Sequence, residues 1–125
     1  MTWSAIGAAG LGLAVILGAF GAHGLRGKLD AYSMGIYERA VFYQFIHAMG
    51  LLVAPILVRM TALRPSTGTL VCALLFAGIV TFSGSLYLLA LTGTRWLGAI
   101  TPIGGVCFIA AWLLLAIALA RGCNP

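Results

Sequence analysis

Two histidines are the side chains of this sequence best suited to chemistry. His23 stands in "GAFGAHGL" and His47 stands in "YERAVFYQFIHAMG". Imidazole titrates near neutral pH and is a common metal ligand, so each residue is suited to carrying protons or holding haem iron. For His23 the sequence also favours a structural alternative. The surrounding glycines weaken helix propensity, so a helix is expected to end there with the imidazole capping its last carbonyl groups.

A polar face accompanies His47 through an otherwise apolar run. Arg39, Tyr43 and His47 are spaced at i, i+4 and i+8, and Gln44 precedes His47 by three residues, so all share one helix face. An unpaired amide or imidazole in hydrocarbon costs roughly 2–7 kcal/mol. These side chains must therefore point into the protein, either as a binding site or as bonds that fix helix register. In both cases burial predicts that Gln44→Ala and His47→Ala lower thermal stability.

Small hydroxyl residues in "TFSGSLYLL" are candidate partners for this face. Thr81 and Ser85 fall on one side of a helix, and Ser83 and Tyr87 fall on another. Such residues pack tightly and bond across membrane helices, contributing about 0.6 kcal/mol each, which favours a structural role. Together with the polar face they are also suited to lining a small polar pocket.

Pro102, in "RWLGAITPIGG", predicts a kink or unwound turn near the start of the last apolar run. Proline cannot donate a hydrogen bond to the carbonyl of Gly98, and two glycines follow at once. Broken membrane helices bind ions or substrates in transporters, although most prolines near a helix start are structural. The candidate ligand-binding residues are therefore His47, Gln44, Tyr43, His23, Ser83, Ser85 and Pro102.

The elements that must position these residues are membrane-spanning helices. The chain has 125 residues, of which 62% are hydrophobic and 7% charged, and its mean hydropathy is +1.12. A helix needs about 20 apolar residues to cross a bilayer, and four uncharged runs reach that length. The runs do not alternate as barrel strands do. We expect an all-α, polytopic four-helix bundle in one transmembrane domain, 1–125, with spans at about 3–22, 40–58, 69–91 and 96–120.

The first span and its connection to the second carry further signals. Gly7, Gly10, Ala14, Gly18 and Gly21 lie along one helix face and predict close packing, against another helix of this chain or of a second copy. A short interfacial segment follows the first span. Its Asp30 is suited to capping a helix that begins near residue 31. That arrangement places the two histidines at different depths.

Charge and motif patterns exclude several functions. The net charge is +5, but the basic residues are scattered singly, which fits contact with the lipid bilayer and not with nucleic acid. The balance of basic residues between the two ends leaves orientation open. Asp30 and Glu38 are the only side-chain carboxylates, and hydrolase and phosphate-loop motifs are absent, so no catalytic residue and no enzyme is predicted. Three cysteines, Cys72, Cys107 and Cys123, match no metal-binding spacing, and no metal site is expected.

Three motifs in order along the chain carry a resemblance. "GAFGAHGL", "YQFIHA" and "FSGSLYLLALTGTRWLGAITPIGG" resemble the YgdD-like family of small bacterial membrane proteins, a domain of unknown function with short eukaryotic relatives. The resemblance implies a four-helix, multi-pass protein of the bacterial inner membrane. It implies no activity and no mapped site residues.

Two functions remain open from the sequence. The first is a binding, scaffold or transport-associated component that uses the face of Gln44 and His47, in a homo-oligomer or with a membrane-protein partner. The second is a redox module that binds haem or quinone through His23 and His47. The different membrane depths expected for the two histidines disfavour their binding to one iron. The sequence assigns no cofactor to either.

Overall fold

The computed structural model describes residues 1–122, and Cys123 lies outside them. The described chain is helical and contains four segments long and apolar enough to cross a membrane, so the all-α membrane architecture is confirmed. In chain order the elements are α1 (Thr2–His23), α2 (Ala31–Met60), α3 (Pro65–Gly78), the π-helix η1 (Ile79–Ser83), α4 (Gly84–Thr92), the 3₁₀-helix η2 (Arg95–Ala99) and α5 (Thr101–Gly122).

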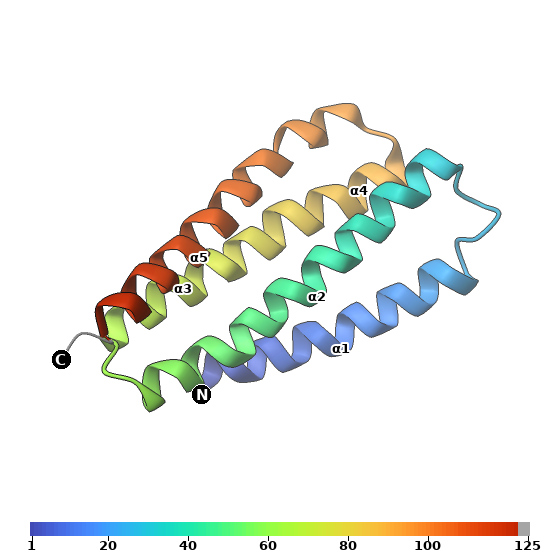
Figure 1. The fold of residues 1–125 in the computed structure, drawn as a ribbon. Helices are drawn as coiled ribbons and strands as arrows, with labels where there is room; N and C mark the ends of the chain where they lie inside the picture. Colours follow the sequence, from blue (N-terminus) through green and yellow to red (C-terminus); the bar gives the residue numbers. More distant parts are fainter. Residues whose placement is uncertain (123–125) are drawn as a thin grey trace.

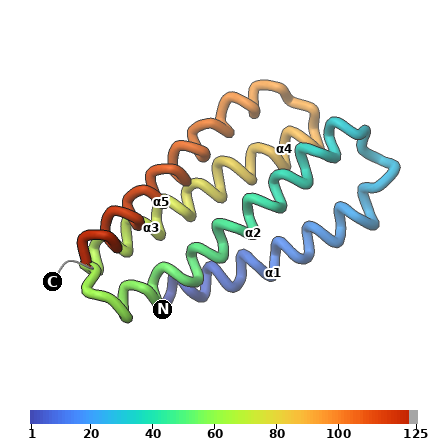
Figure 2. Tube along the Cα trace, in the orientation of Figure 1, coloured from blue at the N-terminus to red at the C-terminus, as the bar shows by residue number. Residues whose placement is uncertain are grey.

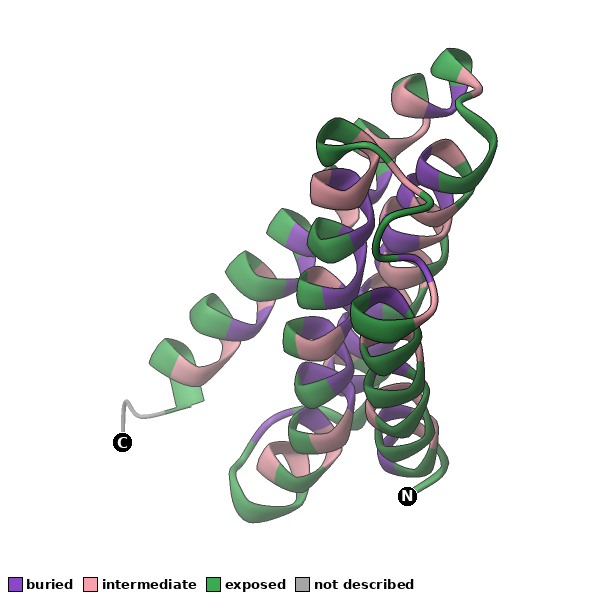
Figure 3. Ribbon diagram, turned by 90° about the vertical axis from the view of Figure 1, so that its right-hand side faces the viewer, coloured by how far each residue is buried: buried purple, intermediate pink, exposed green. Residues whose placement is uncertain are grey.

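The helices run up and down, with α2 between α1 and the continuous rod of α3, η1 and α4 (Figure 1). Helix α5 packs along α3 and η1 on the side away from α1. Helix α1 begins and α5 ends at the same end of the bundle (Figure 2). Buried residues gather on the faces that the helices turn toward one another, while the outward faces are exposed along their length (Figure 3). Because those outward residues are chiefly apolar, the surface suits lipid.

The connection between α1 and α2 is short and capped. Gly24 closes α1 by donating its backbone N–H to the Phe20 carbonyl at 2.6 Å, and Gly27 adopts φ +84°, which favours glycine. Asp30 then accepts the Ser33 N–H at 2.7 Å and caps α2, which begins at Ala31 as predicted. That bond lowers the pKa of Asp30, so the cap persists until the pH falls through this lowered value.

Residues 31–60 form one helix, so the interfacial connection is confined to residues 24–30. The uncharged run starts later than the helix because Glu38 and Arg39 lie on an exposed side of α2. A charge on an exposed face ends an apolar run without ending the helix that carries it.

The stripe of small residues on α1 packs against α2 of the same chain. A Cβ at Gly7 would lie 2.5 Å from the backbone nitrogen of Leu52 and 2.8 Å from the carbonyl oxygen of Ala48. Beside it, the Ser4 hydroxyl donates to the Leu52 carbonyl at 2.9 Å. The predicted close packing is therefore confirmed, and it joins two helices of one chain.

The third and fourth spans also approach closely. The π-helix η1 interrupts the third span, and a Cβ at Gly104 of α5 would lie 2.5 Å from the Phe82 backbone nitrogen. The predicted irregularity at the start of the fourth span is present, but it lies before the proline. Helix η2 ends at Ala99 and α5 begins at Thr101, which places Pro102 in the first turn, where its missing N–H costs nothing.

Candidate functional site

Gln44, near the middle of α2, joins three helices through its amide. Its Nε2 donates to the carbonyl oxygen of Gly10 on α1 at 2.9 Å, and its Oε1 accepts the Tyr87 hydroxyl of α4 at 2.7 Å. The side chain is only 3% exposed, so both bonds form away from water. A primary amide has two N–H groups and two carbonyl lone pairs, and these bonds use one of each. Within residues 1–122, one donor and one acceptor position of Gln44 therefore make no hydrogen bond.

Two further polar groups lie beside this amide. The Ser83 hydroxyl donates to the Ala40 carbonyl of α2 at 2.8 Å, and the serine is 1% exposed. The Tyr37 ring meets the Tyr87 ring edge to face at 5.3 Å, and its hydroxyl donates to the Leu17 carbonyl of α1. Ser83 is the last residue of the π-helix, a type of helical irregularity that often occurs at functional sites.

Gln44, Ser83 and Tyr87 line a groove between α1, α2 and the third span, whereas Tyr37 lies outside it. The groove encloses about 450 Å³, within the range of small-molecule sites. Its polar lining comes from Gln44, Ser83 and Tyr87, and the rest is apolar, including Leu13, Leu17 and Ile79. The groove thus combines apolar walls with a few polar groups near the middle of the span.

His47 faces a different interface. Its ring stacks on Phe108 of α5, with centroids 3.4 Å apart. The Tyr43 ring stacks on the His47 ring at 5.7 Å and lies tilted against Phe82 at 4.4 Å. Its Nδ1 lies 2.7 Å from the Tyr43 carbonyl oxygen, which can only accept, so Nδ1 carries a proton. The imidazole is 5% exposed. His47 is therefore part of an aromatic contact between α2 and α5, and the groove residues do not include it.

The remaining predicted residues lie apart from the groove. Ser85 contacts the Thr101 hydroxyl at 2.6 Å and donates to the Phe82 carbonyl, so it joins α4 to the start of α5. Pro102 is exposed in the first turn of α5. His23 is exposed at the end of α1, and among the hydrogen bonds of residues 1–122 none involves its imidazole, so the expected side-chain cap is not formed. The structure thus groups Gln44 with Ser83 and separates both from His23, His47, Ser85 and Pro102.

The joint ligation of one haem iron by His23 and His47 is contradicted by their positions. Gly10 lies level with Gln44, and His23 follows Gly10 toward one end of the bundle while His47 follows Gln44 toward the other. At 1.5 Å per helical residue, the two imidazoles are on the order of 20 Å apart along the bundle. Two axial ligands of one iron must both reach the metal, which this separation prevents.

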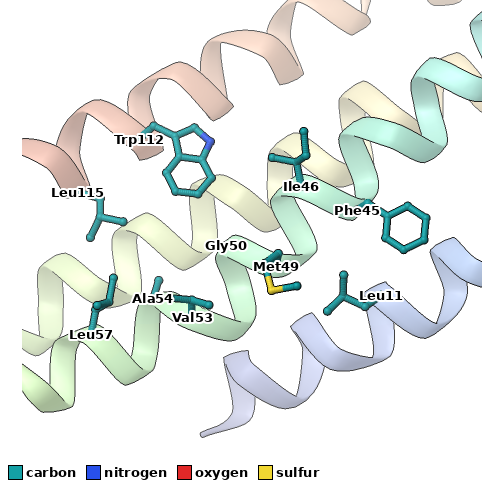
Figure 4. Close-up of a pocket in the computed structure, with 10 residues that line it drawn as sticks. All are labelled: Leu11, Phe45, Ile46, Met49, Gly50, Val53, Ala54, Leu57, Trp112 and Leu115. Atoms are coloured by element: carbon teal, nitrogen blue, oxygen red, sulfur yellow. The ribbon is translucent and has the colours of Figure 1, made fainter.

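A second hollow lies on the other side of α2 and is lined by apolar side chains. It encloses about 520 Å³ between Leu11 of α1, residues 45–57 of α2, and Trp112 and Leu115 of α5. Figure 4 shows Trp112 and Leu115 on α5 facing Ile46 and Met49 across this space. An almost entirely apolar lining in a membrane span suits contact with lipid chains.

Comparison with known sequences places the chain in a family. The family described as "Protein of unknown function (DUF423)" matches residues 17–105, more than half of the chain. This chain belongs to the DUF423 family. A UPF0382 membrane protein of Staphylococcus epidermidis is 54% identical over 116 residues, covering 93% of each chain. The UPF0382 membrane protein YwdK of Bacillus subtilis is 45% identical over 118 residues, covering 93% of this chain and 94% of its own. No solved structure matches.

Family membership settles the class of the protein and leaves its activity open. With bacterial membrane proteins as relatives and four candidate spans, this DUF423 chain is a multi-pass bacterial membrane protein of unknown function. A family of unknown function is what the sequence resemblance implied, while the narrower YgdD-like name stays a prediction. Within residues 1–122, no three His, Cys, Asp or Glu side chains lie together as a metal site.

Tyr87 of the DUF423 chain was not among the predicted ligand-binding residues, although it completes the Gln44 site. The available signal was its place on the same helix face as Ser83 within an apolar run. The sequence analysis therefore named it as a candidate partner of the Gln44 face, and the hydrogen bond confirms that partnership.

A double-mutant cycle tests the Gln44–Tyr87 bond. We expect Gln44→Leu to lower the free energy of unfolding by roughly 2 kcal/mol, because it removes bonds to two helices. Tyr87→Phe removes one of these bonds, and the two changes together should cost about 1 kcal/mol less than their sum. The measurement is unfolding by SDS titration in mixed micelles. Strict additivity would show that the two side chains do not interact.

Proposed function

We propose that this protein is a non-catalytic membrane component that binds a small, lipid-like molecule in the groove above Gln44. The observation that carries this proposal is the combination of about 450 Å³ of largely apolar space with the Gln44, Ser83 and Tyr87 groups at its floor. A groove that held only lipid tails would need no hydrogen-bonding groups. An amide that served only to join helices would not need to lie beside a groove. Unused hydrogen-bonding positions of Gln44 inside such a groove suit a ligand with an apolar body and one polar group.

The position of the groove supports the same ligand class. Gln44 lies near the middle of α2, so a molecule reaches it from the hydrocarbon part of the bilayer. An apolar ligand partitions into that region at high local concentration, while a strongly charged one is excluded. A carbonyl or hydroxyl group on the ligand would complete the hydrogen bonding of Gln44 and Tyr87. A quinone or a fatty alcohol has this chemistry.

The experiment fills the groove without disturbing the packing around it. Gly84 lines the groove, and a Cβ at this position meets no atom within 4 Å, so Gly84→Leu should fold while occupying the ligand's space. Gly35 is equally free of neighbours but lies outside the groove, which makes Gly35→Leu the matched control. Each variant is reconstituted in nanodiscs of host lipid extract and released for native mass spectrometry.

We expect the unaltered protein and Gly35→Leu to retain one discrete small mass in addition to any bound phospholipid, and Gly84→Leu to lose that mass. Tyr87→Phe should weaken retention by roughly tenfold, because one hydrogen bond in a low-dielectric site is worth about 1.4 kcal/mol. Tyr32→Phe makes the same chemical change at an exposed position and should have no effect. A bare protein, or equal retention in both leucine variants, would contradict the proposal.

A further inference from the structure

A separate pocket lies at the end of the bundle where α2 leads into α3 and α5 ends. It encloses about 410 Å³ between the α2–α3 connection, the first turn of α3 and the last turns of α5. Leu63, Leu114 and Ile117 form apolar walls, and Arg64 and Arg121 border the same space. Both arginines are exposed, so their guanidinium groups are accessible at the membrane surface. The pocket is therefore amphipathic, with a basic rim above an apolar interior.

The distribution of charge identifies the sign of the ligand. Of the two side-chain carboxylates of the protein, Asp30 caps the start of α2 and Glu38 lies in its first part, whereas Arg59 lies in its last turn. At 1.5 Å per residue, Glu38 and Arg59 are about 30 Å apart along α2, several times the screening length of about 8 Å in physiological salt. The arginine-bearing end thus has no side-chain carboxylate to balance it.

The opposite end of the bundle shows a contrasting arrangement. There, Arg26 and Glu38 border one hollow, so a basic and an acidic side chain share the same surroundings. Among the described residues that line it, the pocket of Arg64 and Arg121 has two basic side chains and no acidic one, and Thr67 adds a hydroxyl. Of these two pockets, charge complementarity therefore favours an anionic occupant in the one that Arg64 and Arg121 border.

We propose that this pocket binds an anionic phospholipid from the adjoining leaflet. The phosphate group would lie between the Arg64 and Arg121 guanidinium groups, because a guanidinium presents paired N–H donors that match phosphate oxygens. The upper part of one acyl chain would lie against Leu63, Leu114 and Ile117. Basic pockets between membrane helices are suited to such headgroups. This site shares no residue with the Gln44 groove and does not depend on its function.

Competition between two lipids in the same nanodisc tests the proposal. The protein is reconstituted with equal parts of phosphatidylglycerol and phosphatidylcholine, and the retained lipid is identified by native mass spectrometry. The test variant is Arg64→Gln with Arg121→Gln. The matched control is Lys28→Gln with Arg95→Gln, which removes the same charge from two exposed positions at the opposite end. Thermal unfolding establishes that both variants are folded.

We expect the unaltered protein to retain phosphatidylglycerol selectively. The Arg64 and Arg121 variant should lose that preference by roughly 30-fold, because each basic residue contributes a factor of about five. The control should keep the preference. An equal loss in both variants would show nonspecific attraction by net charge and would overturn the site. Displacement of the lipid by excess inorganic phosphate would also overturn it, because binding would then require no acyl chain.

Discussion

Gly7→Ala is expected to lower the free energy of unfolding by about 3 kcal/mol, although it adds a single methyl group. The added Cβ would lie 2.5 Å from the Leu52 nitrogen, 2.8 Å from the Ala48 oxygen and 2.9 Å from the Leu51 carbonyl carbon. All of these are backbone atoms of α2, so no side chain is able to rotate away. The helices must separate, which also weakens the nearby bond from Ser4 to the Leu52 carbonyl.

Gly12→Ala is the matched control on the same helix. A Cβ at Gly12 meets nothing within 4 Å, so alanine should be neutral or slightly stabilising because it favours helix more than glycine does. Both variants are unfolded by SDS titration in mixed micelles. Equal midpoints for Gly7→Ala and Gly12→Ala would mean that α1 does not pack on α2 at the observed distance.

His47→Ala is expected to cost about 3 kcal/mol of stability, whereas His23→Ala should change it by less than about 0.5 kcal/mol. The His47 ring is 5% exposed and stacks on Phe108 at 3.4 Å, with Trp112 at 6.0 Å. Truncation leaves a cavity between α2 and α5 that these rings cannot refill. His23 is exposed at the end of α1, where truncation removes no packing.

His47→Phe separates packing from chemistry at the same position. Phenylalanine keeps an aromatic ring against Phe108 but lacks the Nδ1–H that bonds the Tyr43 carbonyl. We expect it to restore most of the stability lost in His47→Ala, measured by thermal unfolding in detergent. If His47→Phe were as unstable as His47→Ala, the imidazole would be required for its polar atoms, and a ligating or proton-carrying role for His47 would regain support.

The second span illustrates how far sequence patterns reach. The spacing correctly indicated that Gln44 and His47 are buried, because residues three and four apart lie together on any α-helix. It was wrong for Arg39, which was placed on the same face but is exposed near the start of α2. It did not separate Gln44, which contacts α1 and α4, from His47, which contacts α5. A face of a helix is wide enough to meet two neighbours, and only the packing angles decide which residue meets which.

The sequence predicted the arrangement of the hydroxyl residues of the third span more accurately. Their predicted division into two faces is confirmed, since Ser83 and Tyr87 contact α2 while Ser85 contacts Thr101. The acceptor of the Ser83 hydroxyl was not predictable from the sequence. Ser83 bonds a backbone carbonyl, at Ala40, and every residue carries such a group, so no residue type marks it.

The sequence by itself determined the solvent, the number of spans and the small-residue packing face of α1, because apolar length and residue size are local properties of the chain. The tertiary structure decided that this face meets α2, that the two histidines lie far apart, and that Gln44 borders a groove with Ser83 and Tyr87. These outcomes depend on the relative rotation and separation of whole helices. Many contacts, several of them to backbone atoms, set that rotation together, and no single motif encodes it.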